Sequence, residues 1–174
     1  YPNHHSIEEK NFLGVNIPAS GSPDPNGDLK TALDTLFNHP NLPPFFSKQL
    51  IQHLVTSNPS PAYIGRVAAV FKDNGQGVRG DMKAVITAIL LDPEARDAAT
   101  NAGNPQNGKV REALLRYTNW ARAFTAQSRT GSYYLGSTED PIWGLGQMTM
   151  RSPTVFNWFA PGYSPPGTSI GQAG

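Results

Sequence analysis

The spacing of apolar residues between positions 61 and 91 constrains the fold of this chain more than any other feature. In this stretch apolar side chains recur every three or four residues, the period of an α-helix with one buried face. The two sets are Ile64, Val67, Ala68 and Phe71, then Met82, Val85, Ile86, Ile89 and Leu90. Ser60-Pro61 and Asp81 precede them and are typical helix N-caps. The pattern therefore predicts two consecutive helices.

Similar signals predict helices on both sides of this pair. Their expected starts are Ser6 (a capping box with Glu9), Asp28, Pro43, Asp92 (one short turn), Lys109 (the longest helix, to about residue 126) and Ser152. The helix after Asp28 has an apolar stripe expected to face the core: Leu29, Ala32, Leu33, Leu36 and Phe37. No segment has the pattern of a strand. We therefore predict an all-α fold, a single multi-helix domain over residues 1–174, with five or more helices and long Gly/Pro- and aromatic-rich loops.

The stretch "NGQGVRGD" contains the G-x-G-x-x-G spacing at Gly75, Gly77 and Gly80. A dinucleotide site with this motif needs a strand before the first glycine and a helix after the last. Here the preceding segment has helical periodicity, so we interpret the motif as a connector between two helices. A strand at residues 66–71 would revive the nucleotide hypothesis. A calcium loop starting at Asp73 is the other alternative, but ligands are missing at the alternate positions.

The balance of charge excludes some classes of partner. The chain has 14 basic and 13 acidic residues, no cysteine, and a formal net charge of +1. A nucleic-acid surface is therefore not expected, and neither disulfides nor thiolate metal sites can form.

No apolar run reaches the roughly 18 residues of a membrane span. The chain starts at Tyr1 without a leader pattern, so we expect it to be processed or excised from a longer protein.

Long blocks of the sequence resemble a known family. They are "HSIEEKNFLG", "ALDTLFNHPN", "NLPPFFSKQLIQHLVTSNPSPAYIGRVAAVFKDNGQGVRGDMKAVITAILLDPEAR" and "LGQMTMRSPTVFNWFAPGYSPPGT". Together they resemble the C-terminal part of the bacterial family catalogued as domain of unknown function 1800. The resemblance implies a fragment of a longer, exported protein in a periplasmic or extracellular setting. It suggests as partners the missing N-terminal half, another exported protein or a polysaccharide, and it implies no particular reaction.

Histidines and carboxylates give only weak signals of a site. His4, His5, Glu8 and Glu9 could form a minimal metal pair, with a third ligand from His39 or His53. However, a helix that starts at Ser6 leaves both early histidines outside it, so we expect a surface terminus, no metal and no cofactor. His39 is expected to cap a helix end, and His53 to be partly buried. No serine has the strand–turn–helix setting that a nucleophile elbow needs, and adjacent Glu139 and Asp140 form no obvious acid–base pair.

The region 133–163 is the best candidate for function. Its aromatic residues are Tyr133, Tyr134, Trp143, Phe156, Trp158, Phe159 and Tyr163. Rings and amides on loops suit recognition of sugars or peptides. Because large aromatic rings are usually buried anchors, the favoured interpretation is that they anchor an irregular segment onto the core. The candidate ligand-binding residues are Trp143, Gln147, Asn157, Trp158 and Tyr163. We expect a binding or assembly module for a partner protein or an extracellular polymer. The alternative is a hydrolase of saccharides or esters, so enzymatic activity is left open.

Overall fold

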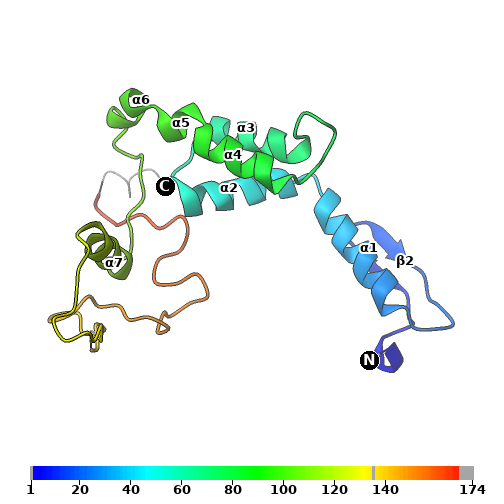
Figure 1. Cartoon of the computed structure of the whole chain (residues 1–174). Helices are drawn as coiled ribbons and strands as arrows, with labels where there is room; N and C mark the ends of the chain where they lie inside the picture. Colours follow the sequence, from blue (N-terminus) through cyan, green and yellow to red (C-terminus); the bar gives the residue numbers. More distant parts are fainter. Residues whose placement is uncertain (1, 135, 169–174) are drawn as a thin grey trace. The chain divides into compact units, whose positions relative to one another are not determined.

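The structure, a computed structural model, describes residues 2–134 and 136–168. Within them the chain is mostly helical, which confirms the predicted class (Figure 1). The elements are a 3-10 helix at Pro2–His4, β1 (Lys10–Phe12), β2 (Val15–Ile17), α1 (Pro25–Asn38), α2 (Leu42–Leu54), α3 (Pro61–Lys72), α4 (Met82–Leu91), α5 (Pro93–Arg96), α6 (Ala98–Ala102) and α7 (Ala113–Ala123). The chain divides into two compact units, residues 1–46 and 47–174. A single domain over the whole chain stays a prediction.

The first unit contains a β-hairpin that the sequence analysis did not predict. Strands β1 and β2 pair antiparallel, with Lys10 opposite Ile17 and Phe12 opposite Val15. Leu13 and Gly14 join them with φ values of 49° and 80°, the left-handed geometry that suits a two-residue hairpin turn. The predicted helix at Ser6 is wrong. The Ser6 hydroxyl instead accepts the Glu8 N–H at 3.1 Å, a local turn that competes with helix formation.

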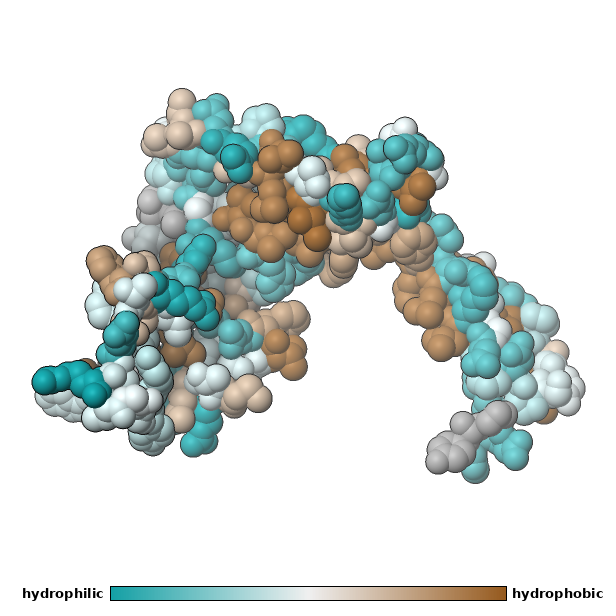
Figure 2. Space-filling view, viewed as in Figure 1, coloured by the Kyte–Doolittle hydropathy of each residue, from teal (hydrophilic) through white to brown (hydrophobic). Residues whose placement is uncertain are grey.

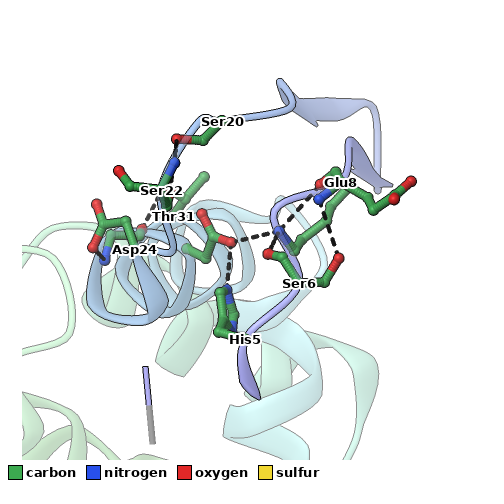
Figure 3. Close-up of polar contacts among 10 residues, drawn as sticks. His5, Ser6, Glu8, Ser20, Ser22, Asp24 and Thr31 are labelled. Carbon is green, nitrogen blue, oxygen red and sulfur yellow. Dashed lines mark hydrogen bonds and ion pairs between the residues drawn. The ribbon is translucent and has the colours of Figure 1, made fainter. Parts of the chain in front are cut away.

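Helix α1 begins four residues earlier than predicted. Its N-cap is Asp24, whose side chain accepts the Gly27 N–H at 2.9 Å, and not Asp28. Asp28 lies within the helix, and its carboxylate binds Lys10 at 2.8 Å and His5 at 2.7 Å. Figure 3 shows His5 beside α1. Hydrogen bonds from Lys10 and then His5 lower the pKa of Asp28. His5 is therefore engaged in tying the N-terminal segment to α1.

The apolar stripe of α1 does not form a core, contrary to the prediction. The exposed residues of this stripe are Leu29, Leu33, Leu36 and Phe37. Figure 2 shows apolar side chains gathered along α1. Besides α1, residues 2–46 comprise only a 3-10 turn, a short hairpin and the start of α2. These offer little surface against which α1 could bury four large side chains.

The core of the second unit lies where α3 packs on α4. Its buried apolar residues are Ile51, Tyr63, Val67, Ala68, Phe71, Val85 and Ile89. The Tyr63 hydroxyl donates to the Ile89 carbonyl at 2.6 Å, and burial, followed by the charges of Asp92 and Glu94, raises the pKa of Tyr63. Ser60 and Asp81 cap α3 and α4 as predicted, since each accepts N–H groups from its own first turn. The caps and the buried positions Val85 and Ile89 thus agree with the prediction, but Ile86 and Leu90 of the predicted α4 core face are exposed, because no described part of the unit covers that side of the helix.

The glycine motif is a connector, as interpreted from the sequence. Residues 66–71 lie inside α3 and not in a strand, so the structural context of a dinucleotide site is missing. Gly75, Gly77 and Gly80 all have positive φ, between 76° and 88°. The Asp73 carboxylate accepts the N–H groups of Gly75 and Gly77, both at 2.8 Å. The donors that would face a phosphate are therefore already satisfied by the chain itself.

The last third of the chain departs from the prediction at both of its expected helices. Helix α7 starts at Ala113, and the segment 109–112 before it is not helical. With 11 residues it is shorter than α1, which has 14. The helix predicted from Ser152 is also wrong, because turns and an isolated bridge between Thr154 and Asn157 replace it. Across the described ranges, 2–134 and 136–168, no helix has the length and apolarity needed to cross a membrane.

Candidate functional site

A cavity of about 790 Å³ in the second unit is the most substantial candidate site. It lies among the end of α2, the segment that leads into α7, α7 itself and residues 155–161. Its lining is His53, Leu54, Val55, Lys109, Val110, Arg111, Glu112, Leu115, Asn119, Val155, Phe156, Asn157, Phe159 and Pro161. The lining therefore combines cations, one carboxylate, two amides and apolar side chains, the mixture typical of a ligand site.

Backbone contacts hold the segment before α7 in an extended path. The Ser57 N–H donates to the Gly108 carbonyl at 2.9 Å, and the Gly108 N–H donates to the Thr56 hydroxyl at 3.0 Å. The Lys109 ammonium donates to the carbonyls of Gln52 at 2.8 Å and Pro161 at 3.0 Å. Burial lowers the pKa of Lys109, and the nearby Glu112 charge opposes this shift. Since an ammonium has three N–H groups, one donor of Lys109 is left for another acceptor.

Glu112 organises one wall of the cavity. It occupies the N-cap position of α7, yet its buried carboxylate makes no bond to that helix. Its Oε1 instead accepts the backbone N–H groups of Trp158 at 3.0 Å and Phe159 at 2.9 Å. A carboxylate that receives two N–H groups is a strong anchor, because hydrogen bonds to a charged group exceed neutral ones. Glu112 thus fixes residues 158–159 against the start of α7.

Gln147, a predicted ligand-binding residue, is buried and engaged within the chain. Its Oε1 accepts the Leu114 N–H at 3.0 Å, one of the free donors in the first turn of α7. Thr138 adds a second tie, because its hydroxyl donates to the Gln147 carbonyl at 2.6 Å. Gln147 therefore supplies the cap that Glu112 does not provide, and its visible role is to attach residues 138–147 to α7.

The aromatic rings divide into two groups. Tyr133, Tyr134 and Trp143 are largely exposed, and the Trp143 ring is 90% exposed. The Asp140 carboxylate accepts the Trp143 N–H at 2.8 Å, and backbone hydrogen bonds from Trp143 and then Ile142 lower the pKa of Asp140. The exposed Trp143 ring is thus carried by a turn that hydrogen bonds to Asp140 hold in place.

Trp158 and Tyr163 belong to the second, half-buried group. The Tyr163 ring stacks on Phe159 with centroids 4.3 Å apart, and the Tyr163 carbonyl accepts the Ser57 hydroxyl at 3.0 Å. Asn157 is exposed, has a φ of 72°, and is the one predicted candidate that lines the cavity. A ligand-binding role for the five candidates stays a prediction.

Sequence reasoning missed five polar residues of the cavity: His53, Lys109, Arg111, Glu112 and Asn119. The expected helix from Lys109 placed Lys109 and Arg111 outside its apolar stripe. A structured turn at Gly108, whose φ is 117°, separates them from the loop before it. His53 was expected to be partly buried and is exposed. The "NG" pair at Asn107-Gly108 was the available signal that a turn, followed by an extended segment, precedes α7.

The free donors in this cavity favour a negatively charged ligand. Within the described residues, the Arg111 guanidinium makes no hydrogen bond or ion pair, whereas the one lining carboxylate, Glu112, is already bonded. Lys109 retains a donor, and Asn119 and Asn157 add amides that lie at the cavity wall. Between residues 2 and 168, residue 135 aside, no group of three or more His, Asp or Glu side chains could hold a metal ion.

The fold and this cavity define a mostly helical chain with a ligand-sized, cation-bearing pocket. The chain belongs to the family described as "Protein of unknown function (DUF1800)", whose model matches residues 1–173. This match confirms the resemblance read from the sequence. Comparisons with curated proteins and with solved structures found no match.

Proposed function

We propose that this chain is a ligand-binding module of an exported protein, in a periplasmic or extracellular setting, and that its cavity takes an anionic segment of an extracellular polymer. The observation that carries the proposal is the Arg111 guanidinium, which lines a cavity of about 790 Å³ without a partner among the described residues. Lys109 supplies a second positive charge, and the carboxylate of Glu112 is engaged by two backbone N–H groups. Planar guanidinium groups are well suited to bind carboxylates through two N–H donors.

The displayed rings support binding to a polymer. Phe156 is 56% exposed at the cavity, and Tyr134 and Trp143 are more exposed still. Aromatic faces on the surface of a module offer stacking area for successive units of an extended ligand. A polymer bound in the cavity could therefore stack on Phe156, which lines it.

The composition of the cavity favours binding over the hydrolase alternative. Among the described residues, its lining includes a single carboxylate and no serine, threonine or cysteine. Glycoside hydrolysis generally uses two carboxyl groups, and ester hydrolysis needs an activated nucleophile. A hydrolase remains the second prediction, with Glu112 as the residue to test.

Titration with an acidic polysaccharide tests the proposal. Polygalacturonate is the probe, and dextran is its neutral comparison, with binding measured by calorimetry at low salt. Replacing Arg111 by Ala should weaken polygalacturonate binding about tenfold, the effect of losing one charge-assisted hydrogen-bonding group. The matched control is Arg116→Ala, which removes the same charge from an exposed position of α7 that does not line the cavity.

Three results would contradict the proposal. These are equal weakening by the two arginine substitutions, equal binding of dextran, and no binding of polygalacturonate at all. Release of new reducing ends by the wild-type protein, lost in Glu112→Gln, would favour the hydrolase instead.

A further inference from the structure

A second cavity of about 560 Å³ in the same unit shares no lining residue with the first. It lies at the start of α3, beside α5 and the loop after α6. Its polar lining residues are Asn58, Ser60, Arg66, Glu94, Asn101, Asn104 and Gln106. Four of these seven side chains are neutral amides, each of which offers both donors and an acceptor.

Hydrogen bonds within the chain preform the walls of this cavity. The Ser60 hydroxyl donates to Glu94 at 2.5 Å, and the Ser60 N–H donates to the same carboxylate at 2.9 Å. On the other side, the Asn58 amide donates to the Gln106 carbonyl at 3.3 Å. The Asn104 side chain accepts the Gln106 N–H at 3.0 Å, which fixes the loop after α6. A preformed cavity loses less entropy when a ligand binds.

The charged groups at this cavity are already paired with one another. Its lining has one cation, Arg66, and one anion, Glu94. The Arg66 guanidinium donates two bonds to Asp92, at 2.7 and 2.8 Å, and lies 3.7 Å from Glu94. With Asp92 counted, the cluster holds two carboxylates and one guanidinium, so an anionic ligand is disfavoured here, in contrast to the first cavity.

Asn101 has the side-chain amide that is available to bind a ligand in this cavity. Its half-buried side-chain amide lines the cavity and makes no hydrogen bond within the described part of the chain. Three prolines, Pro59, Pro61 and Pro93, add rigid apolar walls around the amides. Amides beside apolar faces match a ligand that has hydroxyl groups on its edges and C–H groups on its faces. Saccharides combine these two features.

We propose that this second cavity is a binding site for an uncharged saccharide, recognised by the amides of Asn101 and its neighbours and by the Arg66–Glu94 pair. The site is independent of the proposed function of the first cavity, because the two have different lining residues and opposite requirements for ligand charge. The ligand class is a neutral, polyhydroxylated ring of one or two sugar units, which a cavity of about 560 Å³ can enclose.

Side-chain amide NMR of the 174-residue chain tests this site directly. The probes are glucose, N-acetylglucosamine, cellobiose and maltose, added separately. At least one probe should shift the amide signals of Asn101, Asn104 and Gln106 in a saturable manner, and 0.5 M NaCl (~3–5 Å screening length) should not weaken binding. The Asn101→Ala variant should bind about tenfold more weakly, the effect of losing one neutral hydrogen-bonding side chain.

The matched control is Asn119→Ala, which removes an amide from the first cavity and should leave saccharide affinity unchanged. Wild-type-like backbone spectra of both variants would show that they fold. Shifts confined to the first cavity, equal affinity in Asn101→Ala and wild type, or no saturable shift with any probe would each overturn the proposal. Because polygalacturonate binding is measured separately on Arg111→Ala, failure of this site leaves the proposed function standing, and the reverse also holds.

Discussion

The α3–α4 pair and the segment around α7 are held together by different forces, although both lie in the second unit. Residues such as Val67 and Ile89 are fully buried, and apolar contact dominates there. Helix α7 has no buried residue, and its neighbours are fixed by polar side chains that bond to backbone groups. Glu112 and Gln147 provide those bonds. The first cavity therefore lies in a region that is stabilised by hydrogen bonds from polar side chains to backbone groups, and not by a buried apolar core.

The largest effect is expected in the apolar region. Replacing Ile89 by Ala should lower the free energy of unfolding by about 2–5 kcal/mol, because the removed side chain leaves a cavity in a packed interior. Urea denaturation followed by circular dichroism measures this loss. Ile86→Ala on the same helix is the matched control. Ile86 is 40% exposed, so its loss should be below about 1 kcal/mol. Equal losses for the two variants would show that the Ile86 side of α4 is buried as fully as the Ile89 side.

A smaller and more local effect is expected at Glu112. Glu112→Ala should cost about 1–3 kcal/mol, because it leaves the N–H groups of Trp158 and Phe159 without their acceptor. Hydrogen exchange should accelerate at those two amides and not at the amides of α3, which would separate local opening from global unfolding.

The Glu112→Gln variant is the control for this local effect. It keeps an oxygen acceptor and should fall between wild type and Glu112→Ala. Uniformly faster exchange in α3 as well would contradict the division between the two regions.

The ion pair of Arg66 and Asp92 makes the apolar region sensitive to acid. The hydrogen bonds from Arg66 lower the pKa of Asp92, despite the opposing effect of burial. The carboxylate thus adds stability above its unfolded pKa of about 3.9, and this contribution is lost as the pH falls through the lower folded pKa. Arg66→Ala should cost about 1–2 kcal/mol at neutral pH, a modest value because the guanidinium is half exposed.

Urea midpoints measured between about pH 1.5 and 7 check this dependence, because the range must extend below the lowered pKa of Asp92. Below the folded pKa of Asp92, wild type and Arg66→Ala should converge. A constant difference across the range would show that the arginine contributes through packing alone.

Sequence periodicity predicted helices better than it predicted their burial. The stripe of α3 became core, and the equally regular stripe of α1 stayed exposed at Leu29 and Leu33. The period identifies the apolar face, but burial depends on what another part of the chain offers to that face. The missed hairpin has a similar cause. Leu13 and Gly14 both adopt left-handed backbone geometry. Glycine adopts this geometry readily, but a leucine gives no sequence signal that predicts it.

The candidate site was predictable only in part. Aromatic composition directed attention to residues 133–163, and Asn157 from this region lines the cavity. However, the residues that build the cavity wall, Lys109 and Glu112, contact partners about 50 positions away, as in the bond from Lys109 to Pro161. Long-range backbone acceptors leave no local pattern in a sequence, so a carboxylate that binds Trp158 cannot be distinguished from a solvated one.

The smallest effect on stability is expected at Trp143. Its ring is 90% exposed, so Trp143→Ala should change the free energy of unfolding by less than about 0.5 kcal/mol. Iodide quenching of tryptophan fluorescence should nevertheless fall, because the substitution removes the most exposed of the three tryptophans and leaves Trp120 and Trp158. A loss above about 1 kcal/mol, or unchanged quenching, would show that the ring is covered. The ring would then be an anchor of the irregular segment, and the aromatic layer would belong with the apolar region.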